Sequence, residues 1–151
     1  MLPFLPEDAE VILGDGLRAQ DVAELEALGR TPREALLEAV GSCGVLVFTI
    51  HVDGRAAGVF GAMPTDIPGL GAAWMVGTDR LLLARRDLVV EGRRWLAFLN
   101  KVYPTLTNYV DERNSVSIDW LELLGFEFPY EDDFITPSGV VFRRFLLCAT
   151  P

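Results

Sequence analysis

Residues 114–126 read NSVSIDWLELLGF, and this stretch decides the fold. Asn114 or Ser115 can accept a backbone N–H hydrogen bond in the first turn of a helix. Apolar side chains then recur at helical spacing, namely Val116, Ile118, Trp120, Leu121 and Leu124. Gly125 supplies the left-handed residue that often ends a helix, and Phe126 opens a strand. We therefore expect a capped amphipathic helix whose apolar stripe is buried against a sheet.

Strands are expected on both sides of this helix. Residues 106–111 are rich in β-branched and aromatic side chains and precede it directly. Residues 126–130 and 140–147 are expected to form the last two strands, around the Pro-Ser-Gly turn at residues 137–139. The C-terminal third is thus predicted as strand, helix and two strands.

Two helices are predicted in the first forty residues. The segment 18–28 places leucines and a valine at helical spacing, with Asp21, Glu24 and Glu26 expected to face solvent. The second helix begins with a capping box, in which Thr31 is the N-cap and Glu34 is the third helical residue.

A β-hairpin follows these helices. Residues 45–52 and 55–63 are β-rich runs separated by Asp-Gly, a pair that tolerates positive φ in a tight turn. A short strand is expected at 72–76 and a long helix from about residue 80 to 101. This order predicts an α+β fold with a mixed sheet flanked by helices. No linker divides the 151 residues, so we expect one domain, 1–151.

The charge distribution limits the possible partners. The net charge is −9, which disfavours general nucleic-acid binding because phosphates require a basic surface. Nine acids fall in residues 1–40 and eight in residues 111–133. Between them lies a basic island, which consists of Arg80, Arg85, Arg86, Arg93 and Arg94.

Membrane and metal roles are also disfavoured. The N-terminal residues lack a basic stretch, and no apolar run approaches the roughly 20 residues of a membrane helix, so we expect a cytoplasmic protein. His51 is the only histidine and no Cys-x-x-Cys pair occurs, so no structural metal is expected. Cys43 and Cys148 are interpreted as small core residues, and His51 as a surface residue.

The stretch 106–126 resembles the C-terminal part of the GNAT superfamily of acyl-CoA-dependent N-acyltransferases, whose pattern is a strand, an Asn, a short helix and Gly-Phe. More narrowly, residues 108–126 (NYVDERNSVSIDWLELLGF) resemble a GNAT-like family of tailed bacteriophages that is associated with virion assembly or internal virion proteins. The resemblance implies a single GNAT-like domain. The superfamily often adds a strand before its first helix, for which residues 9–13 are the candidate.

The resemblance also implies acetyl-CoA as cofactor, with its pyrophosphate at the N-terminus of the helix after strand 72–76. That loop normally carries an Arg or Gln followed by glycines, whereas here Leu81, Leu82 and Leu83 stand where small residues are expected. Candidate cofactor-binding residues are Arg80, Arg85 and Arg86, whose guanidinium groups could replace the amides, and Asn114, which would order the turn. The alternative is that the arginines form a solvated helix face and that Asn114 is only a cap.

Two further positions concern catalysis. Many family members protonate the departing thiolate with a Tyr four residues before the Gly of Gly-Phe, and Leu121 stands there. The remaining candidates are Tyr109 as acid and Asp79 as base. Their alternative roles are strand packing for Tyr109 and an Asx turn or helix cap for Asp79.

Three functions follow from these observations. The first is a phage-encoded GNAT-like protein with a degenerate acetyl-CoA site that serves virion assembly through contacts with a virion or host protein, in the host cytoplasm. The second is an acetyl-CoA-dependent N-acetyltransferase acting on an amine. The third is an interaction module that uses a hydrophobic patch. The acyl acceptor and the oligomeric state are left open.

Overall fold

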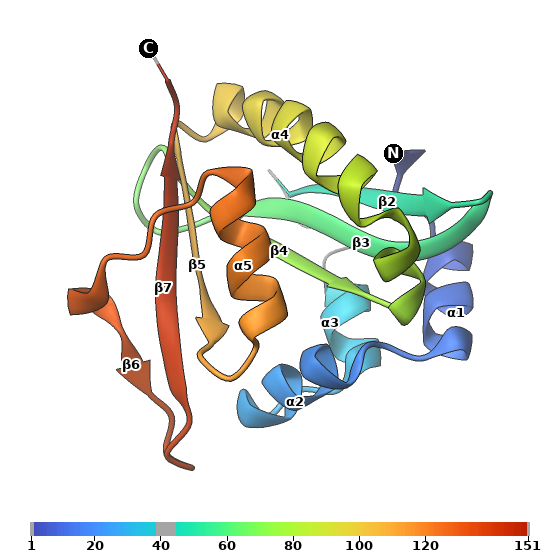
Figure 1. The fold of residues 1–151 in the computed structure, drawn as a ribbon, viewed down its shortest axis with the longest axis horizontal. Coiled ribbons are helices and arrows are strands. Elements are labelled where there is room, and N and C mark those ends of the chain that lie inside the picture. Colours follow the sequence, from blue (N-terminus) through green and yellow to red (C-terminus); the bar gives the residue numbers. More distant parts are fainter. Residues whose placement is uncertain (1, 39–44, 151) are drawn as a thin grey trace. The chain divides into compact units, whose positions relative to one another are not determined.

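The computed structural model describes residues 2–38 and 45–150, so the predictions for Cys43 and for the end of the second helix lie outside the described residues (Figure 1). The helices are α1 (Pro6–Asp15), α2 (Ala19–Ala27), α3 (Pro32–Glu38), α4 (Arg85–Val102) and α5 (Ser115–Leu124), with 3-10 helices η1 (Asp79–Ala84) and η2 (Tyr130–Asp132). The strands are β1 (Leu2–Pro3), β2 (Leu46–Val52), β3 (Arg55–Pro64), β4 (Leu70–Gly77), β5 (Thr105–Asp111), β6 (Phe134–Ile135) and β7 (Val141–Cys148).

The strands form a mixed sheet in the order β1-β2-β3-β4-β5-β7-β6. The β4–β5 pair is parallel, whereas β1–β2, β2–β3, β5–β7 and β6–β7 are antiparallel. This confirms the predicted α+β class with a mixed sheet flanked by helices. The chain also divides into two compact units, the first made of Met1–Met63 and Trp74–Arg85 and the second of Pro64–Ala73 and Arg86–Pro151. Strand β4 begins in the second unit and ends in the first.

The first unit contains the predicted hairpin. Asp53 and Gly54 have φ of 51° and 75°, the left-handed values that a two-residue turn between β2 and β3 requires. A cluster of buried apolar side chains joins α1 and α3 to β3 and to the end of β4, and it consists of Ala9, Ile12, Leu36, Ala56, Val59 and Val76. The hairpin and the helices therefore share one core.

Helix α1 replaces the strand that was expected at residues 9–13. Pro6 occupies its first turn, where the missing N–H costs nothing, and Glu7 and Asp8 lie at the positive end of the helix dipole. Ala9 and Ile12, three residues apart, then face the same core. The strand that the resemblance implied at residues 9–13 was wrong, because these residues lie within α1.

A buried carboxylate ties α1 to β2. The Asp8 carboxylate accepts hydrogen bonds from the Leu5 amide (3.2 Å) and from the Thr49 hydroxyl (2.7 Å). His51 Nε2 lies 3.7 Å from the same carboxylate, and the His51 side chain is only 26% exposed. The interpretation of His51 as a surface residue was therefore wrong, because α1 covers this part of β2.

The second unit contains β5, β7 and β6. All seven residues of β5 pair with β7, and this is the longest strand pairing described in this unit. The predicted helix is confirmed as α5: the Asn114 side chain accepts from the Ser117 amide at 3.2 Å, and Gly125 has φ of 101°. Its apolar stripe is only partly buried, since no residue of α5 is fully buried.

Two expectations for this unit were wrong. Residues 126–130 form only one isolated bridge, between Glu127 and Leu146, and the edge strand is the two-residue β6 further along. Pro129 explains this, because it cannot donate to a ladder. Cys148 is exposed at the end of β7 and is not a core residue.

Candidate functional site

The predicted site residues are divided between the two units. Asp79, Arg80 and Arg85 belong to the first unit, at η1 and the first residue of α4. Arg86, Tyr109 and Asn114 belong to the second unit. Their assignment to cofactor binding or catalysis stays a prediction.

In the first unit, the end of β4 is held by a buried ion pair. Arg18 and Asp21 are 5% and 4% exposed, and the guanidinium donates to the carboxylate at 2.8 and 3.0 Å. The Asp21 carboxylate also accepts from the Gly77 amide at 2.9 Å, and the Arg18 amide donates to the Gly77 carbonyl at 2.8 Å. Asp21 therefore does not face solvent as expected. Sequence reasoning missed this pair, whose only local signal is the i, i+3 spacing at the start of α2.

The amides after β4 are used within the first unit. The Thr78 amide and hydroxyl both donate to the Ala57 carbonyl, at 2.8 and 3.0 Å, and the Leu81 amide donates to the Thr78 carbonyl at 3.1 Å. Leu81 is buried, and its Cδ1 lies 2.2 Å from where a Cβ on Gly77 would stand. The space above Gly77 is thus filled by a leucine side chain.

The segment after β4, where the resemblance places a pyrophosphate, begins with the 3-10 helix η1. Helix η1 ends at Ala84, and α4 begins at the next residue, Arg85. In a 3-10 helix each amide from the fourth residue on donates to a carbonyl three residues back. The amides of Asp79 and Arg80 precede this ladder, at the helix N-terminus where the resemblance places the pyrophosphate, but Leu81 stands where that resemblance expects a small residue.

The arginines of the first unit differ in their surroundings. Arg80 is partly buried, and its Nε is a buried donor without a hydrogen-bond partner among the described residues. Arg85 is exposed at the start of α4. Asp79 is exposed, and Thr78 rather than Asp79 stands at the N-cap of η1, with no side-chain cap bond. The predicted cap role of Asp79 was wrong.

In the second unit, Tyr109 and Asn114 have clear structural contacts. The Tyr109 ring packs edge-on against Phe134, with 4.8 Å between centroids, and 39% of the residue is exposed. Asn114 is buried and caps α5. Both contacts match the packing and capping alternatives, and both leave the chemical roles as predictions.

Asn108 links β4 and β5 through its side chain at the point where their parallel backbone pairing ends. The register covers three residue pairs and stops at Ala72 and Thr107. The Asn108 side chain then donates to the Ala73 carbonyl at 2.8 Å and accepts from the Tyr109 amide at 2.8 Å. A side-chain amide thus replaces the next ladder bond in the second unit. Sequence reasoning missed this role, although a polar residue in the middle of a β-rich run was a signal.

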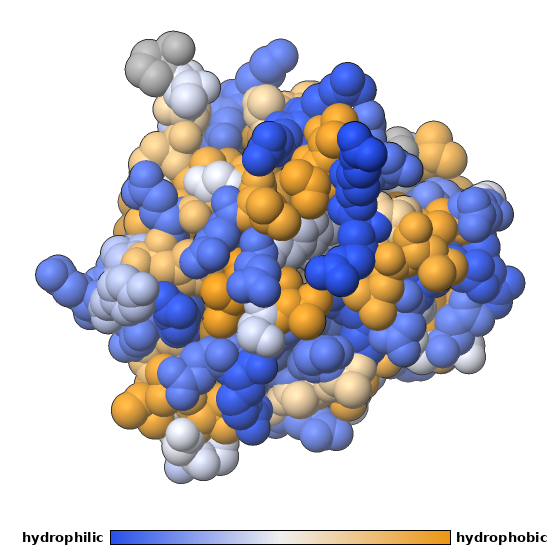
Figure 2. Space-filling view, viewed as in Figure 1, coloured by the Kyte–Doolittle hydropathy of each residue, from blue (hydrophilic) through white to orange (hydrophobic). Residues whose placement is uncertain are grey.

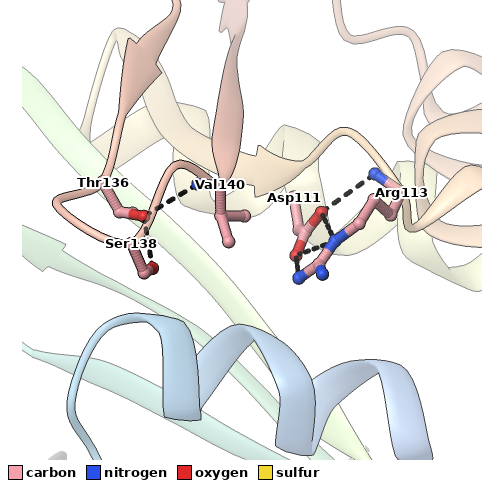
Figure 3. Close-up of polar contacts among 5 residues, drawn as sticks. All are labelled: Asp111, Arg113, Thr136, Ser138 and Val140. Atoms are coloured by element: carbon pink, nitrogen blue, oxygen red, sulfur yellow. Dashed lines mark hydrogen bonds and ion pairs between the residues drawn. The ribbon is translucent and has the colours of Figure 1, made fainter.

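Two polar turns meet at one end of β5 and β7 (Figure 3). After β5, the Asp111 carboxylate accepts from the amide and the guanidinium of Arg113, both at 2.9 Å. Before β7, the Thr136 hydroxyl accepts from the Val140 amide at 3.1 Å and lies 2.9 Å from the Ser138 hydroxyl. These contacts fix the turn that leads into α5 and the hairpin between β6 and β7.

The Asp111–Arg113 pair is expected to make stability depend on pH. Hydrogen bonds from the guanidinium hold the pKa of Asp111 below its ordinary value of 3.8, against the opposing effect of burial. A carboxylate whose pKa is lower in the folded state adds stability above its ordinary pKa and loses it as pH falls through the folded value. We expect the free energy of unfolding of Asp111→Asn to fall less than that of the wild type as the pH is lowered below about 4.

Urea unfolding at several acidic pH values measures this effect. Arg113→Gln should remove the same part of the pH dependence, because the two groups make one interaction, and the double variant should add nothing further. Equal acid slopes in the wild type and Asp111→Asn would refute the assignment.

No helix that could span a membrane and no metal-binding group is found among the described residues. None of the helices within 2–38 and 45–150 has both the length and the apolar composition that a membrane span requires. In the same part of the chain, no three His, Cys, Asp or Glu side chains converge on a point where a metal ion could bind.

The fold is similar to that of solved acetyltransferases. A probable GNAT-family acetyltransferase from Chromobacterium violaceum superposes with a TM-score of 0.70, at 16% identity, over 97% of this chain and 85% of the other. A GCN5-related N-acetyltransferase from Brucella melitensis gives 0.69 at 17% identity, over 97% and 73% of the chains. The ribosomal-protein-S18-alanine N-acetyltransferase from Escherichia coli gives 0.62 at 14% identity, over 99% and 92%.

Sequence comparison adds nothing to this likeness. No protein-family model matches the chain, and no curated protein matches it. At these identities the superpositions establish the fold alone. The chain has the fold of the GNAT acetyltransferases.

Proposed function

We propose that this chain is a phage-encoded GNAT-fold protein whose acetyl-CoA site is degenerate and which serves virion assembly through protein contacts in the host cytoplasm. The observation that supports a degenerate site is the buried Leu81 side chain, whose Cδ1 lies 2.2 Å from where a Cβ on Gly77 would stand. Leucines occupy residues 81–83, where a cofactor loop of this kind would have small residues that let the backbone approach the pyrophosphate. The absence of a tyrosine at Leu121 agrees with a lost acid.

The surface charge supports a protein partner. Residues 111–133 carry eight acids, of which Glu112, Asp119, Glu122, Glu127, Glu131 and Asp133 are exposed and form no ion pair within the described residues. A basic protein surface would complement them and would be attracted over a distance. The resemblance of residues 108–126 to the phage family directs the proposal to a virion or host protein.

The alternative function is an acetyl-CoA-dependent N-acetyltransferase acting on an amine. The observation in its favour is the fold that the chain shares with proteins named as acetyltransferases. Arg85 and Arg86 would then hold the cofactor phosphates by side-chain contacts, since both are exposed and neither forms an ion pair within the described part of the chain. Asn114 would order the turn, Asp79 would act as base and Tyr109 as acid.

Isothermal titration with acetyl-CoA and with CoA separates the two functions. We expect no binding tighter than about 1 mM, which corresponds to roughly −4 kcal/mol. Micromolar binding, roughly −8 kcal/mol, would overturn the degenerate site. In that case Arg85→Ala combined with Arg86→Ala should weaken binding, and an unchanged affinity would remove the arginines from the cofactor site.

The virion role has its own test. Particles of the phage that encodes the chain should contain it or require it to assemble, as measured by mass spectrometry of purified particles and by deletion of its gene. Particles that assemble normally without the protein would refute this part of the proposal.

A further inference from the structure

Helices α4 and α5 share an exposed face in the second unit. The Arg93 guanidinium of α4 donates two hydrogen bonds to the Leu123 carbonyl at the end of α5, at 2.6 and 3.1 Å. Gly92 also lies against Leu124, whose Cδ2 is 2.8 Å from where a Cβ on Gly92 would stand. The two helices are therefore neighbours, and their outer sides form one continuous surface.

The α4 side of this surface is basic. One side of α4 carries six of its exposed residues, namely Arg86, Val90, Arg93, Arg94, Ala97 and Lys101. At 100° per residue they fall within a sector of about 100°. Two acids also lie on α4, of which Glu91 pairs with Arg94 at 2.8 Å and Asp87 is exposed. The net charge of this stripe is positive in a chain of net charge −9.

The α5 side is acidic. Its exposed residues are Ser115, Asp119, Glu122 and Leu123, and Glu112 is exposed in the turn before the helix. No basic side chain pairs with Asp119 or Glu122 within the described residues. A basic stripe thus lies directly beside an acidic one.

Apolar side chains are mixed with these charges. Val90 of α4 and Leu123 of α5, at 52% and 56% exposed, lie among the charges, and Phe98 and Val102, at 42% and 51%, flank the basic stripe on α4. In Figure 2, apolar and strongly hydrophilic residues alternate over the area where Figure 1 shows α4 and α5. Exposed apolar groups among charges are typical of a protein contact surface.

We infer that this α4–α5 face binds the same face of a second copy of the chain. A two-fold axis places the basic α4 of one copy on the acidic α5 of the other, and the reverse, so that both contacts are formed at once. If the two copies instead packed with α4 against α4, the arginines of one copy would lie against those of the other. Helix α4 has 18 residues and is about 27 Å long, which suits an interface of ordinary size.

Sedimentation velocity over a range of protein concentrations tests this dimer. At low salt we expect a monomer–dimer equilibrium. Raising the ionic strength from about 0.05 to about 0.5 M should raise the dissociation constant by tenfold or more, because the charges are exposed and screened. A wild-type protein that stays monomeric at the highest concentration and lowest salt would overturn the inference.

Charge reversal locates the interface. Arg86→Glu with Arg94→Glu makes both stripes acidic, and Asp119→Lys with Glu122→Lys makes both basic, so each variant should be monomeric alone. A mixture of the two should form a heterodimer, because an acidic face then meets a basic one. A mixture that stays monomeric would refute this surface, and so would dimers that survive in each variant alone.

The matched control changes the same charge elsewhere. Glu26→Lys with Asp66→Lys alters two exposed acids that are not on α4 or α5, and it should leave dimerisation unchanged. Circular dichroism and unfolding curves check that each variant is folded. The inference goes beyond the proposed function, since the dimer does not depend on whether acetyl-CoA binds.

Discussion

Replacing Asp21 by alanine is expected to lower the free energy of unfolding by about 3–5 kcal/mol. The change removes the carboxylate that Arg18 faces at 5% exposure, and it leaves a buried guanidinium without its counter-ion. It also removes the acceptor of the Gly77 amide. A broken buried ion pair costs more than an exposed one, because the remaining charge stays desolvated.

Urea unfolding followed by circular dichroism measures this loss. The control is Glu10→Ala, which removes the exposed partner of Arg33 and should cost less than about 1 kcal/mol, since both side chains are more than half exposed. The pair Arg18→Met with Asp21→Leu removes both charges and should recover part of the loss. Equal effects of Asp21→Ala and Glu10→Ala would show that the first carboxylate is solvated.

The second large effect is expected for Gly61→Ala. A Cβ at this position of β3 would lie 2.1 Å from the Leu46 carbonyl oxygen and 3.2 Å from Val47 Cα, both of them backbone atoms of β2. Backbone that is paired in a ladder cannot move as a side-chain end can. We expect a loss above the about 1–3 kcal/mol of ordinary overpacking.

Gly14→Ala is the matched control. Gly14 lies in α1 with nothing within 4 Å of its ideal Cβ, and its φ is not in the left-handed region. Alanine should therefore stabilise the helix, by about 0.5–1 kcal/mol. We expect thermal unfolding to show Tm shifts of opposite sign for the two variants, and a Gly61→Ala protein as stable as the wild type would refute the predicted clash with β2.

The elements with local signals were predictable from the sequence. The capping box was confirmed, because the Thr31 hydroxyl accepts from the Glu34 amide at 3.2 Å and the Glu34 carboxylate accepts from the Thr31 amide at 2.9 Å. The same holds for the Asn114 cap and the Gly125 stop. Caps act over four residues, so a sequence contains all of their determinants.

Features that depend on distant partners were not predictable. Asp21 is a polar residue on an amphipathic helix, and only the position of Gly77, 56 residues further on, makes it a buried acceptor. Asn108 likewise depends on the Ala73 carbonyl. The start of α1 does have a local signal in the sequence, because Pro6 and the two acids after it are typical of a helix N-terminus.

In the candidate site, too, local features were predictable and features that depend on distant contacts were not. Residue types indicated that Leu81 to Leu83 would not line a phosphate site, and this is why the degenerate function could be formulated from the sequence. A helix from about residue 80 was expected, but the 3-10 form of its first turns could not be foreseen, because a 3-10 segment differs from an α-helix only in which carbonyls its amides meet.

Strand β4 also has a consequence for synthesis on the ribosome. Its first residues pair with β5, whose partner positions 105–107 are made 35 residues later, while its last residues complete the first unit. Strand β3, the other neighbour of β4 in the sheet, is made before it, but the β4 edge that faces β5 has no partner until β5 has left the exit tunnel. During that period this exposed strand edge is open to aggregation.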